Sequence, residues 1–301
     1  MGYNIRQALR DFLKENEPRL VFFLVTMWQT QERAITYKEL REAILAGDID
    51  PEWLEEWQQD YSNFVTTVLQ PYWLAAIDDA AGQWETWLAE RMEAGWYDPN
   101  LIGIQTWVTE RAASFVTNST QTQIDAIRVL VQRAAQHEVL NVDQLARAIR
   151  PTVGLTKPQA VANMKYYEKL IEGGMSQKRA QELQIRYAAR QHRYRGYNIA
   201  RTELAFAYNK GAHDGAKQAQ DHGLLGDCVK RWSAVLDERT CDYCRELNGK
   251  EIAMDEEFDF PTKLAATNPG IRLTPPAHPS CRCGVEYVEI TPPIIKEGGA
   301  E

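Results

Sequence analysis

The chain has 301 residues, of which 44% are hydrophobic and 25% charged, and its formal net charge is -8 at pH 7. Such a composition is typical of a globular protein with one large or two ordinary cores, and it excludes a disordered chain. The acidic balance argues against a protein that coats nucleic acid with its whole surface, so any contact with DNA must be local.

Residues 1–140 are predicted to be helical. The first six residues lack the basic and apolar segments of a signal peptide, so we expect no export. The most apolar run, Leu20 to Trp28, is about half of the roughly 20 residues that a membrane span requires, and we interpret it as a buried helix. Asp50 followed by Pro51 predicts a helix start, and Pro71 predicts a kink or break in the next helix.

Tryptophan is concentrated in this first region: eight of the nine tryptophans lie between Trp28 and Trp107. Trp53 and Trp57 are four residues apart and therefore share one helical face. Two interpretations stay open. The rings form the core between packed helices, or some are exposed anchors for a ring-shaped partner, because aromatic residues dominate interface centres.

Residues 141–222 are again predicted to be helical, with clear boundaries. Asn141 is a start signal, and Thr156 with Gln159 forms a capping box. Gly173 stops that helix, and Ser176 begins the next. After residue 203 the inward positions carry small side chains, which lets another backbone approach closely.

One face of the helix after Ser176 is basic, although the chain as a whole is acidic. A basic helix face is a solvated surface in most proteins; the alternatives are contact with DNA phosphates or with an acidic protein partner. The chain shows no helix-turn-helix or base-reading element, so any DNA contact should be independent of sequence. The residues of this face are Lys178, Arg179, Arg186, Arg190, Arg193 and Arg195.

Residues 223–290 change to a strand-like period. Alternation predicts strands over 229–236, 250–254 and 284–290, with Trp232 at the centre of a small core. Cys228 is expected to be a small buried hydrophobe, and residues 291–301 a poorly ordered tail. The expected fold class is therefore mainly α: a long N-terminal helical region followed by a small α+β C-terminal domain with a short antiparallel sheet.

The remaining four cysteines form two clusters in this last region. Cys241 and Cys244 make a C-x-x-C turn, which His278, Cys281 and Cys283 answer some forty residues later. A structural zinc takes four such ligands in a closed tetrahedral shell, so we predict zinc bound by the four cysteines. A disulfide or a set of reduced thiols is the alternative. His278 competes with Cys283 for the fourth position.

Several residues around these clusters are expected to hold them in place. We predict that Arg201 pairs with Asp237 in bidentate geometry. We also expect Asp237 to accept N–H groups of the turn that presents Cys241. Glu203, Thr240 and Trp232 complete the predicted structural network.

The order of these motifs resembles the phage Mu F-like minor head proteins. The resemblance covers residues 141–290 and rests on Ile199 to Glu203, Trp232, Asp237 to Cys244, Gly249-Lys250 and Pro275 to Cys283. Residues 1–140 carry no motif of that family. The resemblance implies a low-copy structural protein of a tailed phage, located in the virion head near the portal and in the host cytoplasm during assembly. It also implies portal and other head proteins as partners, with a role in head assembly or DNA delivery.

Enzymatic activity is not expected from the sequence. A catalytic zinc keeps one coordination position open, whereas four cysteines fill the shell. A zinc-dependent deaminase would need a His-x-Glu motif before its cysteines, and none is present. A zinc-dependent nuclease or a toxin-like protein is the rival class; because little of the chain follows Ile290, we expect no effector domain. A non-specific DNA-binding protein is the other alternative.

Overall fold

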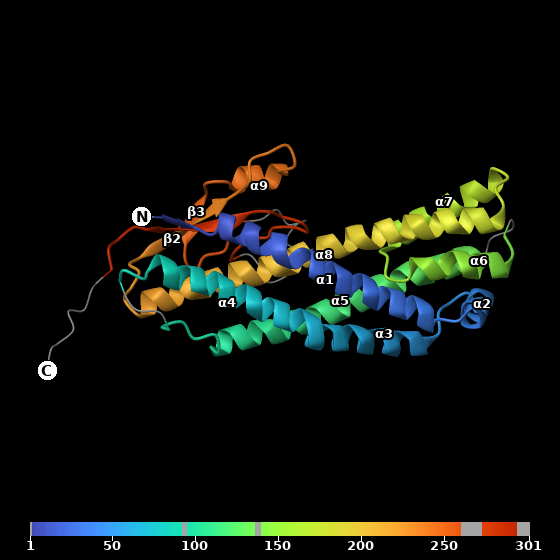
Figure 1. Ribbon diagram of the computed structural model, residues 1–301, viewed down its shortest axis with the longest axis horizontal. Coiled ribbons are helices and arrows are strands. Elements are labelled where there is room, and N and C mark those ends of the chain that lie inside the picture. The colour runs from blue at the N-terminus through green and yellow to red at the C-terminus, as the bar shows by residue number, and fades with distance from the viewer. Residues whose placement is uncertain (1, 92–94, 136–139, 260–272, 294–301) are drawn as a thin grey trace. The chain divides into compact units, whose positions relative to one another are not determined.

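The computed structural model describes residues 2–91, 95–135, 140–259 and 273–293 (Figure 1). It is mainly helical and contains a small antiparallel sheet, which confirms the expected fold class. The helices are α1 (Arg6–Ala34), α2 (Tyr37–Ala46), α3 (Pro51–Phe64), α4 (Gln70–Trp87), α5 (Ile102–Ala135), α6 (Val142–Ile149), α7 (Lys157–Glu172), α8 (Gln177–Asp221) and α9 (Asp242–Leu247). None of the described helices is long and apolar enough to cross a membrane.

Local capping explains where several helices begin. The Asp50 carboxylate accepts the Glu52 N–H at 3.0 Å at the start of α3, with Pro51 in its first turn. Capping boxes start α6 at Asn141 and α7 at Thr156, as the sequence predicts. Pro71 does not break the chain's helical path: a π-helical segment, Val65–Leu69, joins α3 to α4, and Pro71 lies in the first turn of α4.

The sheet has four strands in the order β1-β4-β2-β3, with every pair antiparallel. The strands are β1 (Gly2–Asn4), β2 (Cys228–Ser233), β3 (Glu251–Ala253) and β4 (Gly284–Glu289). In the register, Tyr287 of β4 lies opposite Tyr3 on one side and Lys230 on the other. The sequence predicts only the last three strands, because a three-residue strand at the N-terminus is too short to show a period.

The contacts divide the chain into two compact units. Unit 1 contains residues 1–19, 71–106 and 198–301, and unit 2 contains residues 20–70 and 107–197. Both units combine segments that are distant in sequence, because α1, α5 and α8 contribute residues to each. Neither unit coincides with a region expected from the sequence.

Aromatic and aliphatic side chains form the core of unit 2. Trp53 and Trp57 are buried there with ring centroids 5.9 Å apart. Trp28 is also buried, and its indole N–H donates to the Tyr61 hydroxyl at 3.0 Å. Of the eight tryptophans between residues 28 and 107, six are buried and two are half-buried. The core interpretation is therefore confirmed. The apolar run of α1 is buried on one face only, because Phe22 and Phe23 are exposed.

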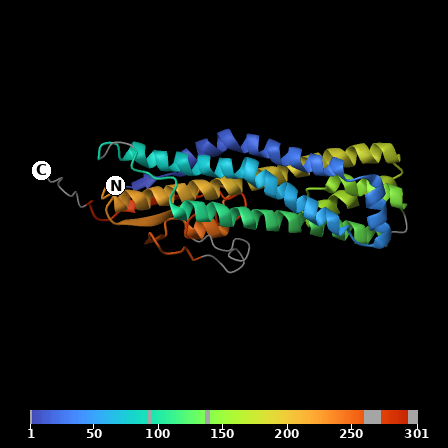
Figure 2. The same cartoon turned by 90° about the horizontal axis from the view of Figure 1, so that it is seen from below.

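Small residues of α8 allow close packing within unit 1. A Cβ atom added at Gly211 would lie 2.4 Å from the Ile77 carbonyl oxygen of α4. The Trp84 indole N–H donates to the Ala212 carbonyl at 2.8 Å. Figures 1 and 2 both show this part of α8 beside α4. The close approach predicted from the small side chains after residue 203 is confirmed.

Candidate metal centre

A small core supports the cysteine clusters. Trp232 of β2 is fully buried, and its ring meets that of Phe258 at 5.0 Å in a near-perpendicular arrangement. Cys244, Cys281 and Cys283 are buried in the same hydrophobic cluster. The prediction that Trp232 is the centre of a small core is confirmed.

The first ligand segment is shaped by a helix start. Cys241 is the N-cap of α9, and its sulfur accepts the Cys244 N–H at 3.4 Å. This capping contact brings the two thiols of the C-x-x-C turn to the same side of the helix end.

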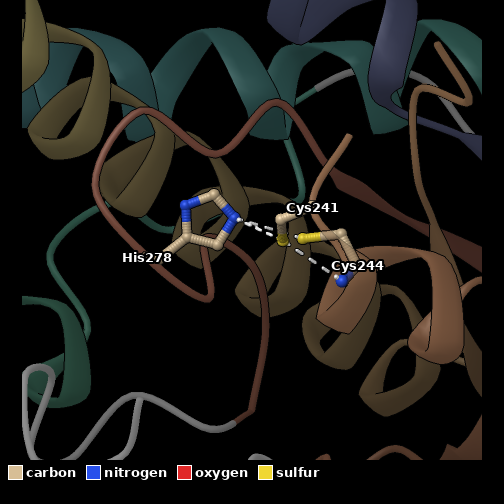
Figure 3. A group of neighbouring side chains, drawn as sticks. All are labelled: Cys241, Cys244 and His278. Carbon is tan, nitrogen blue, oxygen red and sulfur yellow. Dashed lines mark hydrogen bonds between the residues drawn. The ribbon is translucent and has the colours of Figure 1, made fainter. Parts of the chain in front are cut away.

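The second ligand segment brings three further donors to this turn. The His278 Nε2 atom lies 3.2 Å from the Cys241 sulfur and 3.3 Å from the Cys244 sulfur (Figure 3). The Cys281 sulfur lies 3.8 Å from that of Cys244. Two groups result, Cys241 with Cys244 and His278, and Cys244 with Cys281 and Cys283; within each group the donor atoms lie within 4.8 Å of one another.

These donors fit a tetrahedral zinc ion. Zinc–sulfur bonds of about 2.3 Å and zinc–nitrogen bonds of about 2.0 Å place neighbouring donors roughly 3.5–3.8 Å apart. The observed separations are close to this range, and the five cysteines, all within the described residues, are free thiols. Because Cys244 belongs to both groups, His278 and Cys283 are both candidates for the fourth ligand.

The protonation of the cluster shows how strongly the donors interact. A hydrogen bond from Cys244 lowers the pKa of Cys281, and the same bond raises the pKa of Cys244. The hydrogen bond to Cys281 raises the pKa of His278 to about 9. Cys281 is therefore the thiol of this cluster that loses its proton most readily, and a protonated His278 stabilises the charge on its sulfur.

Asp237 joins the two ligand segments through Arg282. The Arg282 guanidinium donates to the two carboxylate oxygens of Asp237 at 2.7 and 2.6 Å, and this pair holds the pKa of Asp237 well below its usual range. The predicted pairing of Asp237 with Arg201 is therefore wrong. Arg282, which lies between Cys281 and Cys283 in the sequence, thus contacts the turn of the first segment, a proximity that only the fold reveals.

The turn before Cys241 is closed by side-chain hydrogen bonds. The Asp237 carboxylate accepts the Arg239 N–H at 2.9 Å, which confirms that Asp237 caps the turn. The Thr240 hydroxyl accepts the Asp237 N–H at 3.0 Å and donates to the carbonyl of Val235. These contacts fix the backbone that presents the first cysteine.

Arg201 has a different acidic partner from the one predicted. Its guanidinium donates to the two carboxylate oxygens of Glu17 at 2.7 and 2.8 Å, and Glu17 is buried. This pair joins α8 to α1 within unit 1. Glu203, two residues further along α8, is also buried.

Ser280 connects the second ligand segment to Thr202 and Asn198 of α8, and the sequence does not predict these contacts. Ser280 has a φ of 60°, and its N–H donates to the Thr202 hydroxyl at 3.0 Å. Its own hydroxyl donates to the Asn198 side chain at 2.5 Å. Thr202 lies in the Arg-Thr-Glu run, so the signal was present in the sequence, but its partner was not identifiable from spacing.

One residue of the predicted basic face of α8 is not exposed. Lys178, Arg179, Arg186, Arg190 and Arg193 are exposed, whereas Arg195 is buried. The Arg195 guanidinium donates to the Gly154 carbonyl and lies 4.9 Å from the Trp28 ring centroid. The correction follows from helical period, because residue 195 is one turn from the buried His192 and shares its inward face.

The fold and the cysteine site thus define a mainly helical protein with a small, cysteine-rich α+β part. Residues 160–286 match the family model described as Phage Mu protein F like protein. This range includes α8, both ligand segments and the first half of β4, and the match confirms the family resemblance there. The family suggests a phage head morphogenesis protein.

A curated relative also shares sequence with part of the chain. The chain is 32% identical over 101 residues to NAD(+)--arginine ADP-ribosyltransferase EFV of Enterococcus faecalis (strain ATCC 700802 / V583). The alignment covers 33% of this chain and 20% of that protein, so the chain matches about a fifth of the relative's length. No solved structure matches the chain.

Proposed function

We propose that this chain is a minor head protein of a tailed phage, present in few copies near the portal vertex. It acts in head morphogenesis and in DNA packaging or delivery, through contacts with the portal and other head proteins. The observation that carries the proposal is the family match over residues 160–286, which contains the Arg-Thr-Glu run and both ligand segments.

The metal site supports a structural role in this proposal. Zinc would be held by Cys241, Cys244 and Cys281, with Cys283 or His278 as the fourth ligand. A closed shell fastens two chain segments whose short strands bury little apolar surface alone. The thiolate-to-metal absorption of cobalt-loaded Cys283→Ser and His278→Ala variants decides the fourth position, because only loss of a cysteine ligand reduces the band.

We infer a role without enzymatic activity. Four protein donors leave no coordination position for a substrate or a reactive water. The ADP-ribosyltransferase relative shares only a fifth of its length with this chain, so its printed activity is not carried over. An NAD-consumption assay with arginine-containing protein as acceptor tests this inference; turnover by the purified chain would contradict it.

Quantitative mass spectrometry of purified particles and empty proheads tests the head assignment. We expect the chain in both, at a low fixed ratio to the major capsid protein, and a loss of incorporation when the portal gene is deleted. The major capsid protein of the same samples is the internal control. Absence from both particles would reject the assignment.

Sequence-independent DNA binding is a second candidate, supported by five exposed cations on α8. If these residues contact phosphates, Arg186→Glu with Arg190→Glu should weaken binding to duplex DNA. It should also make the slope of log binding constant against log salt concentration less steep, by about one for each lost contact. Lys165→Glu with Lys169→Glu, on the exposed side of α7, is the matched control. Equal binding by both variants would reject this candidate.

A further inference from the structure

A groove of about 690 Å³ lies in unit 1, between the first turns of α1 and the turn that precedes the metal site. We call it the α1 groove. Its volume falls within the roughly 300–1,000 Å³ of ligand pockets. Two acidic residues, Glu17 and Asp237, line it together with six basic residues: Arg6, Arg10, Lys14, Arg201, Arg239 and Arg282.

Internal pairing neutralises only part of this positive charge. Arg201 and Arg282 are the bidentate partners of Glu17 and Asp237. The Arg6 guanidinium donates to the carbonyl of Ala234 at 2.8 Å, which leaves its charge uncompensated.

The remaining cations are available to a ligand. Arg10 and Lys14 are exposed and, among the described residues, make no hydrogen bond or ion pair. Arg239 is exposed and lies 3.7 Å from the already paired Asp237. The groove is therefore strongly positive within a chain of net charge -8.

The cations of α1 form a regular row. Arg6, Arg10 and Lys14 are each four residues apart and so lie on one face of the helix. At 1.5 Å of rise per residue, the row is about 12 Å long. A ligand with several negative groups at similar spacing would match it.

Apolar side chains line the groove beside this row. Leu9 and Leu13 are buried at its base, and Val235 lies opposite. Leu236 is 65% exposed, although it is a large hydrophobic residue at the edge of a pocket. An exposed leucine next to unpaired cations indicates a ligand that carries both acidic and apolar groups.

We propose that the α1 groove binds a short acidic segment of another protein, with carboxylates on the Arg10 and Lys14 row and an apolar side chain against Leu236. Guanidinium groups match carboxylates in bidentate geometry. A duplex DNA meets a groove mainly with its phosphates and has no aliphatic side chain to place against Leu236, and the chain's net charge of -8 opposes its approach. The inference does not depend on the head-assembly role, because it rests only on the charge and the lining of the groove. Purified protein suffices to test it.

Selection from a random 16-residue peptide library displayed on yeast, with the full-length chain as bait, tests the proposal. We expect the enriched peptides to combine Asp or Glu with leucine-like residues. Arg10→Glu with Lys14→Glu should weaken their binding at least about tenfold, because opposed charges become like charges. Leu236→Ser should weaken it about threefold, by loss of apolar contact.

The control is Lys165→Glu with Lys169→Glu, which makes the same charge change at the same spacing on α7 and should leave peptide affinity unchanged. Circular dichroism checks that each variant is folded. The proposal is overturned if no peptide is enriched, if the enriched peptides show no excess of acidic residues, or if the groove variants bind them as tightly as the control. It is also overturned if a labelled 20-base-pair duplex binds and loses affinity only in the Arg10 and Lys14 variant.

Discussion

The ion pair between Asp237 and Arg282 holds both cysteine segments in place. The same carboxylate closes the turn before Cys241 and fixes the residue between Cys281 and Cys283. Such contacts behind the ligands set the direction in which the sulfur atoms point. The pair therefore supports the candidate metal site from both segments at once.

Replacing Arg282 by leucine should reduce zinc affinity by about 10- to 100-fold, which is typical when a contact behind a ligand is lost. Competition with a chelating dye measures the change. Arg239→Leu is a suitable control, because Arg239 is exposed and its contact with Asp237, at 3.7 Å, is longer and weaker than that of Arg282. Equal affinities for the two variants would mean that the pair does not support the site.

Two buried histidines predict how stability depends on pH. Burial lowers the pKa of His192 to about 4 and that of His213 to about 3. In the unfolded chain a histidine binds its proton near pH 6.5. Between these values the unfolded state binds more protons, so the free energy of unfolding falls as the pH falls.

We therefore expect urea denaturation to show a stability loss of about 1.4 kcal/mol per pH unit and histidine below pH 6.5. His192→Gln should make this dependence less steep, because glutamine binds no proton in this pH range. Its amide can still donate to the Val153 carbonyl that His192 contacts, so the fold should be kept. An identical pH profile for the wild type and His192→Gln would contradict the expectation.

At the scale of elements, the packing of α8 on α4 depends on the absence of side chains. Gly211 faces backbone atoms of Ile77, which cannot move as a flexible side chain can. Gly215 faces the Trp84 ring, where an added Cβ would lie 2.8 Å from a ring carbon. The helix pair is therefore specified by steric fit, in addition to apolar burial.

Gly211→Ala should destabilise the protein by about 1–3 kcal/mol, because the added methyl group overpacks the helix contact. Gly82→Ala, in α4, provides the opposite case: an added Cβ there meets no atom within 4 Å, and alanine favours helix by up to about 1 kcal/mol. Thermal unfolding of both variants measures the difference. If Gly211→Ala were as stable as Gly82→Ala, α8 and α4 could move apart to accommodate the methyl group without loss of stability.

The elements differ in how well the sequence predicted them. Capping boxes and glycine stops are local signals, so the starts of α6 and α7 were predictable from Asn141 and Thr156. Strand β1 was not, since its three residues acquire their conformation by pairing with β4 at the other end of the chain. The burial of Arg195 depends on the Gly154 carbonyl and the Trp28 ring, which are distant in sequence.

The cysteine clusters were recognisable from spacing because cysteine pairs carry a local pattern, whereas the contacts that support these clusters were not. Glu17, Asn198, Ser280 and Arg282 are ordinary polar residues in the sequence. Their roles arise from tertiary neighbours: Ser280, for example, reaches two residues of α8. The choice of partner for Arg201 failed for the same reason, since Glu17 lies in another helix, 184 residues earlier in the sequence.

At the scale of the molecule, the candidate metal site belongs to unit 1 together with residues 1–19. Cys241→Ser or Cys281→Ser should therefore increase hydrogen exchange in residues 228–259 and 273–290, and also in β1, which pairs with β4. The core of unit 2 around Trp53 should keep its protection. An equal increase in hydrogen exchange throughout the chain, or no increase near the cysteines, would contradict this division.

The pairing of β1 with β4 also affects the order of events during synthesis. All residues of unit 2 have been translated once Tyr197 has left the ribosome, so this unit can fold while the chain is still growing. The first strand, although it is made first, must wait for residues 286–288 before it finds its neighbour. The sheet is thus completed only after β4 has been made, and a nascent chain arrested before Gly284 would present an unpaired β2 edge to chaperones.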